Sequence, residues 1–241
     1  MLELPVSTVR TVSDTKRAFY SLHTRPINSI YRRVVEELMV EMHLLSVNAD
    51  FRYDPIYGLG VATTFERFMQ GYRPDADRDS IFNALCHALP DEPQKYRQDA
   101  EQMRAIAAST NADEFLAQVK QLPDGEVSGL LEILKPIAIN PSFKYSRLFA
   151  IGLYSLIEVM NPELVKDEAK RNEAIQTLAT GLKLSDEKMQ KDLELYRSNL
   201  EKLSQARQVM EDILKADRKK KEERAKAKDL ATTPPQDSPL A

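Results

Sequence analysis

The chain has 241 residues, a net charge of −3 at pH 7, and 29% charged and 42% hydrophobic residues. This length is enough to bury a core in one large domain or two small ones. The near balance of charge gives no electrostatic reason to bind nucleic acid, so no nucleic-acid partner is expected. A single cysteine excludes an intramolecular disulfide framework, and the scarcity of glycine with the absence of tryptophan favours helices over sheets.

The N-terminus and the most apolar run bear on membrane association. The opening residues, "MLELPVSTVRTVSD", have no basic segment followed by an apolar stretch, and they lack the composition of a transit peptide. The run "LFAIGLYSLI", residues 148–157, is too short to span a bilayer. We therefore expect a soluble protein, or one that is at most peripheral to a membrane.

Capping residues, prolines and helical periodicity predict an all-α protein, because no segment shows the alternation typical of a strand. The expected caps are Asp14, Asp54, Asp91 and Asn161. The expected helices are a short one that begins at Asp14 and ends before Pro26, followed by 27–47, 55–71, 77–89, 93–111, 112–121, 125–138, 145–160 and 162–181.

The C-terminal part has a different pattern. Ser185 can cap a long helix whose apolar residues recur every three, four or seven positions. These residues are Met189, Leu193, Tyr196, Leu200, Leu203, Met210 and Leu214. We predict a globular body over 1–184, a heptad-bearing helix over 185–229 that packs partly on the body, and a disordered tail over 230–241. Pairing of the heptad seam with another chain stays an alternative.

The stretch "VVEELMVEMHLL", residues 34–45, places Glu36, Glu37, Glu41 and His43 on one helix. A di-metal helical bundle needs a glutamate and a histidine three apart, and a second helix with the same pair. His43 is six residues from Glu37, so neither condition is met. We expect no metal here, and interpret these side chains as a solvated face.

On the same helix, the spacing predicts a buried stripe of apolar side chains. Its members are Tyr31, Val34, Leu38, Met42 and Leu45. Arg32 and Arg33, four residues before Glu36 and Glu37, should form ordinary surface ion pairs. The alternative function is a helical metal- or pigment-handling protein, in which His43 or His87 would have to recruit acidic side chains from distant segments.

No other motif assembles a catalytic or cofactor site. Cys86 and His87 are sequence neighbours that a helix turns roughly 100° apart, so Cys86 is interpreted as a small core residue. The "GLG" at 58–60 lacks the third glycine of a nucleotide-binding turn, and should instead allow close helix packing. No enzyme activity is predicted.

Aromatic and arginine side chains, which are enriched in interface hot spots, are dense in polar surroundings. The lysines at 219–221 could in addition meet an anionic surface, although acids are interspersed around them. We therefore predict partner-binding residues at Tyr53, Tyr57, Arg67, Tyr72, Arg73, Tyr145, Arg147, Lys219, Lys220 and Lys221.

Three stretches resemble one known family. They are "TVSDTKRAFYSLHTRPINSIYRRVVEELMVEMHLL", "FRYDPIYGLGVATTFERFMQGYRPDADRDSIFNALC" and "FKYSRLFAIGLYSLIE". These stretches resemble the thylakoid formation family, also described as photosystem II biogenesis proteins, and the lack of a transit peptide favours the cyanobacterial form. The resemblance carries no catalytic motif.

The resemblance implies a non-enzymatic accessory role in photosystem II biogenesis and repair. It also implies association with the thylakoid FtsH protease complex and with photosystem II assembly or repair intermediates. The implied location is the cytoplasmic side of the cyanobacterial thylakoid membrane, with peripheral attachment. Neither the resemblance nor the residues fix the oligomeric state.

Overall fold

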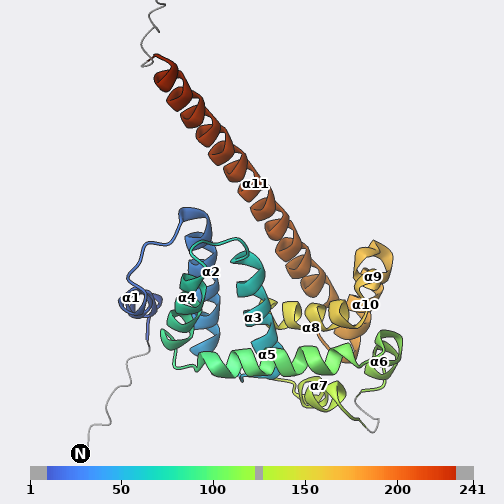
Figure 1. Ribbon diagram of the computed structural model, residues 1–241. Coiled ribbons are helices and arrows are strands. Elements are labelled where there is room, and N and C mark those ends of the chain that lie inside the picture. The colour runs from blue at the N-terminus through green and yellow to red at the C-terminus, as the bar shows by residue number, and fades with distance from the viewer. Residues whose placement is uncertain (1–9, 123–126, 232–241) are drawn as a thin grey trace, which may run out of the picture. The chain divides into compact units, whose positions relative to one another are not determined.

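The structure, a computed structural model, describes residues 10–122 and 127–231. These residues form eleven helices and no strand, which confirms the all-α prediction (Figure 1). The helices are α1 (Val12–Leu22), α2 (Ser29–Ser46), α3 (Pro55–Phe68), α4 (Ala76–His87), α5 (Pro93–Ala108), α6 (Ala112–Val119), α7 (Leu130–Ile139), α8 (Arg147–Met160), α9 (Pro162–Lys166), α10 (Glu168–Gly181) and α11 (Asp186–Ala231).

The helix starts follow from side chains that satisfy free backbone N–H groups. The Asp54 carboxylate accepts hydrogen bonds from the backbone N–H groups of Ile56 and Tyr57, as predicted for the start of α3. Two predicted caps are wrong. Thr11 caps α1, with Asp14 as the reciprocal acid of a capping box. Glu92, not Asp91, precedes α5, and no side chain caps it.

One predicted helix is in fact two. Asn161 accepts hydrogen bonds from Glu163 and Leu164, as the predicted cap should, but the helix that it starts, α9, has only five residues. Asp167 then adopts an extended backbone conformation and accepts a hydrogen bond from the backbone N–H of Lys170, which starts α10. A second capping acid inside the segment therefore divides the expected helix 162–181.

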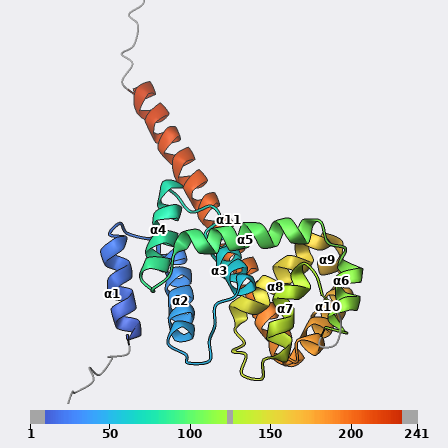
Figure 2. The ribbon, with the colours of Figure 1, turned by 90° about the horizontal axis from the view of Figure 1, so that it is seen from below.

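The core is centred on α3, which packs along both α8 and α5 (Figure 2). A Cβ atom added at Gly60 would lie 1.7 Å from the carbonyl oxygen of Leu148, and one added at Gly152 would lie 2.0 Å from that of Ile56. Glycine therefore lets the backbones of α3 and α8 touch. The expectation of close helix packing at the "GLG" stretch is confirmed at Gly60.

Both ribbon views place α1, α2 and α4 at one end of α5, and α6, α7, α9 and α10 at the other (Figures 1 and 2).

Cys86 of α4 is fully buried, and burial raises the pKa of its thiol, so it is the core residue that the sequence predicts.

The chain divides into two compact units, residues 1–197 and 198–241. The first twelve residues of α11 belong to the first unit, where Met189, Leu193 and Tyr196 are buried. In the second unit α11 continues to Ala231, and the predicted tail beyond that residue falls outside the described residues. In the described part of the chain, no helix has the length and apolar character needed to cross a bilayer.

Candidate interaction surface

The two sides of α2 have different surroundings. Leu38 and Met42 are buried, which confirms the predicted core stripe at these positions. Val34 is only half-buried, and the core position next to it is Val35. His43, predicted to face solvent, is also buried, and its Nδ1 lies 2.9 Å from the hydroxyl of Thr15. That prediction is wrong because α1 packs against this side of α2.

The glutamates of α2 pair with cations from three parts of the chain. Glu36 accepts hydrogen bonds from Lys16 at 2.9 Å and from Tyr20 at 2.7 Å, both on α1. Glu37 pairs with Arg33 at 2.9 Å, as predicted. Glu36 was expected to pair with Arg32 of α2 but pairs with Lys16 of α1 instead. Both carboxylates therefore have an identified partner, and among the described residues no group of three or more His, Cys, Asp or Glu side chains is placed to hold a metal ion.

Glu41 has the most distant partner. Arg147, at the first position of α8, donates a hydrogen bond to its carboxylate at 2.5 Å across 106 residues of sequence. Burial raises the pKa of Glu41, and the guanidinium of Arg147 opposes this rise. The predicted solvated face is thus correct for Glu37, which is exposed, but not for Glu41.

An open groove of about 990 Å³ runs along the outer side of α2. Lys16 of α1 contributes to one wall, and residues 144–147 before and at the start of α8 contribute to another. Val40 and Leu44 lie along it, and Leu44 is 57% exposed. With the exposed Val47 at the helix end, these side chains form an apolar stripe with spacings of four and three, roughly opposite the core stripe.

Charged side chains surround this apolar stripe. The groove is lined by five cations, Lys16, Arg32, Arg33, Lys144 and Arg147, and three carboxylates, Glu36, Glu37 and Glu41. All three carboxylates are paired with cations within the chain, so the charge left over is positive. An exposed apolar stripe inside a polar rim is typical of a protein-interaction surface, and the excess of cations suits an acidic partner.

Two of the predicted partner-binding residues lie in the core. Tyr57 and Tyr72 are each 2% exposed. Tyr57 packs edge to face against Phe51, and Tyr72 packs in the same way against Tyr31 of α2. A buried side chain has no surface to offer, so the prediction of partner contact is corrected for both tyrosines.

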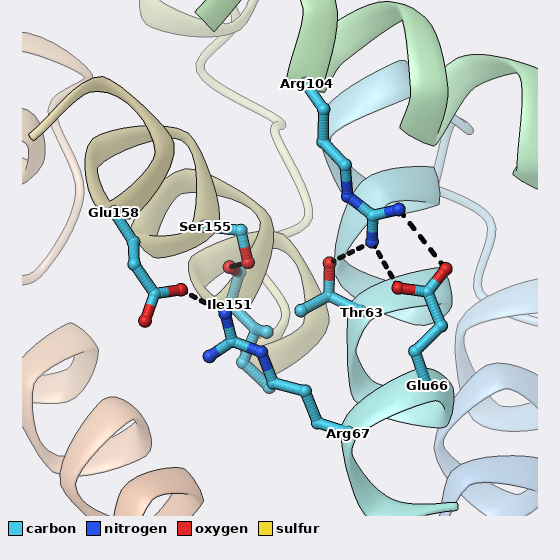
Figure 3. Close-up of polar contacts among 7 residues, drawn as sticks. All are labelled: Thr63, Glu66, Arg67, Arg104, Ile151, Ser155 and Glu158. Atoms are coloured by element: carbon cyan, nitrogen blue, oxygen red, sulfur yellow. Dashed lines mark hydrogen bonds and ion pairs between the residues drawn. The ribbon is translucent and has the colours of Figure 1, made fainter. Parts of the chain in front are cut away.

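Two further residues of the predicted set bond within the chain. The hydroxyl of Tyr53 donates a hydrogen bond to Asp99 of α5 at 2.6 Å, and burial raises the pKa of this tyrosine. Arg67 of α3 pairs with Glu158 of α8 (Figure 3). In the same view, Arg104 of α5 holds α3 by donating hydrogen bonds to Thr63 and Glu66. These polar contacts tie the core helices to one another.

The remaining predicted residues come from three parts of the chain. Tyr145 and Arg147 line the α2 groove, and Tyr145 donates a hydrogen bond to Asp192 of α11 at 2.9 Å. Arg73 is exposed beyond α3 and pairs with Asp75. Lys219, Lys220 and Lys221 are exposed on the second unit. Partner contact at these positions stays a prediction.

The sequence reasoning did not select the groove residues Arg32, Val40, Leu44 and Lys144. A signal for part of this set was present, because Val40, Leu44 and Val47 recur every three or four positions outside the predicted core stripe. No local pattern could indicate Lys144, which reaches the groove only through the packing of α8 against the rest of the fold.

Fold and surface together define an all-α protein with an open, cation-rich groove. The chain matches the thylakoid formation protein family over residues 11–225, and it belongs to that family. Protein Thf1 of Trichormus variabilis is 61% identical over 228 residues, which cover 94% of this chain and 98% of that protein. Protein Thf1 of Nostoc punctiforme is 59% identical over 231 residues, covering 95% and 98%.

A solved structure agrees with this assignment. The structure of Psb29 at 1.55 Å has a TM-score of 0.76 to this chain and 47% sequence identity. The match covers 88% of this chain and 98% of the Psb29 chain. The family that the sequence resembles is therefore confirmed.

Proposed function

We propose that this protein is a non-enzymatic accessory factor in thylakoid formation and in photosystem II biogenesis and repair. In this proposal it associates with the thylakoid FtsH protease complex and stabilises it, and it meets photosystem II assembly or repair intermediates there. Membership of the thylakoid formation family over residues 11–225 supports the general role. The cytoplasmic side of the thylakoid membrane, with peripheral attachment, is the location that this role requires.

The observation that carries the proposed interaction is the α2 groove. Leu44 is a large apolar side chain that is 57% exposed, and a partner that covered it would remove this apolar surface from water. Arg32 lines the same groove and is exposed, so it can pair with an acidic group on that partner. A helical body that binds the assembled protease complex more tightly than its separated subunits would shift the equilibrium toward assembly.

Capture of the FtsH complex from solubilised thylakoids tests the proposal. The full-length protein is immobilised, and the amount of protease complex retained is measured against variants of equal helicity. Leu44→Glu and Arg32→Glu should each weaken capture about tenfold, because they place a charge in the apolar stripe or reverse a rim charge. Ile139→Glu, at an equally exposed aliphatic residue outside the groove, should leave capture unchanged.

Two further variants test the other predicted surfaces. Arg73→Glu should leave capture intact if the groove is the contact, and a loss would place the contact beside α3 instead. Truncation after Leu214 removes Lys219, Lys220 and Lys221, and loss of capture only in this variant would place the contact on α11. If the unchanged protein retains no protease complex, the proposed association is wrong.

A further inference from the structure

Arg171 on α10 is a charged residue in the core of the first unit. The residue is only 7% exposed, and its guanidinium donates one hydrogen bond to the backbone carbonyl of Val165 at 3.2 Å. Among the residues that the structure describes, it forms no ion pair with a carboxylate. A guanidinium has several more N–H donors, and a buried charge without a counter-charge is costly.

A pocket of about 300 Å³ opens beside this guanidinium, between α10 and the part of α11 that belongs to the first unit. Two more cations line it, Lys191 and Arg197, together with the amides of Asn172 and Gln190. Because Arg171 lies at its buried side and Lys191 is exposed, the cations extend from the interior to the opening.

The acidic side chains of this pocket do not neutralise Arg171. Glu168 is exposed at the start of α10, and Glu194 accepts a hydrogen bond from Arg197 at 3.2 Å. Lys191 pairs with Glu187, which does not line the pocket. Lys191 and Arg197 are thus each paired with a glutamate, whereas Arg171, the most buried of the three cations, forms no ion pair with any residue that the structure describes.

We propose that this pocket binds a small organic carboxylate, with Arg171 as the principal ligand and Lys191 at the entrance. A planar carboxylate can accept two parallel hydrogen bonds from one guanidinium, and so could bind N–H groups of Arg171 that have no acceptor among the described residues. Ile175 and Leu193, both almost fully buried, close the inner end of the pocket with apolar atoms. This inference is independent of the proposed association with the protease complex.

Titration of the full-length protein with succinate, at constant ionic strength, tests the site by NMR. The Nε–H signal of Arg171 should shift saturably, because the carboxylate binds that group directly. Lys191→Gln should weaken the apparent affinity about fivefold by removing one charge from the entrance. Lys166→Gln is the matched control, since Lys166 is also exposed and paired with a nearby glutamate but lies outside the pocket.

Each outcome decides for or against the site. A saturable shift that Lys191→Gln weakens and Lys166→Gln leaves unchanged would support it. Tighter binding of inorganic phosphate than of succinate would overturn the assignment of the ligand class. The absence of a saturable shift with either anion would overturn the site, and Arg171 would then serve only to bond the last turn of α9.

Discussion

The α3–α8 contact and the α1–α2 contact hold the first unit together in different ways. Between α3 and α8 the backbones touch at Gly60 and Gly152, so the contact requires a particular residue at a particular point. Between α1 and α2, side chains make the polar contacts, through Thr15 with His43 and Lys16 with Glu36. The α3–α8 contact therefore determines how the core helices pack, whereas the α1–α2 contact leaves the outer side of α2, with its groove, accessible to a partner.

The largest effect is expected from breaking the α3–α8 contact. Gly60→Ala should cost more than about 4 kcal/mol of unfolding free energy or prevent folding, because its Cβ would overlap a backbone carbonyl that cannot rotate away. The measurement is urea-induced unfolding followed by circular dichroism. Gly58→Ala is the control, since its Cβ would meet the hydroxyl end of Tyr53, which can move. Equal costs for the two variants would refute the distinction.

A second prediction separates the two sides of α2 with one type of substitution. Leu38→Ala should cost about 3 kcal/mol, because it leaves a cavity in the core. Leu44→Ala, in the same helix, should change stability by less than about 0.5 kcal/mol, since its side chain is exposed. Glu37→Gln should be similarly small. Chemical denaturation checks all three, and a large cost for Leu44→Ala would show that the groove is part of the core.

The smallest effect concerns pH and the attachment of α1 to α4. His23 is buried, and its Nδ1 lies 2.9 Å from the hydroxyl of Ser80. Burial lowers the pKa of His23 from 6.5; the carboxylate of Asp77 opposes this shift, and the charge of Arg25 adds to it. The unfolded chain therefore binds the proton more tightly, so this stabilisation is complete above pH 6.5 and is lost as the pH falls.

Unfolding free energies between pH 8 and pH 5 measure this effect. The unchanged protein should lose stability below pH 6.5 by at most about 1.4 kcal/mol per pH unit more than His23→Gln, which has no proton to bind there. Both proteins contain the same carboxylates, so subtracting one curve of unfolding free energy against pH from the other cancels their contribution. Parallel curves would show that His23 accepts its proton without cost in the folded state.

Helix positions and the inner side of α2 could be predicted because their causes are local. Asp54 followed by Pro55 starts α3 by neighbouring atoms alone, and the spacing of Leu38 and Met42 turns both to one side of a helix. The second cap, Asp167, is also present in the sequence, but the prediction relied on Asn161 with Pro162 as the start and Gly181 as the end of one continuous helix.

The sequence by itself determined the all-α class, the approximate positions of most helices, the family and the core side of α2, because each depends on residues close together in the chain. Only the tertiary structure decided that His43 is buried, that Glu41 pairs with Arg147, and that Tyr57 and Tyr72 are unavailable to a partner. Burial and ion pairing depend on which helices pack together, and Glu41 meets Arg147, 106 positions further along the chain, only through that packing.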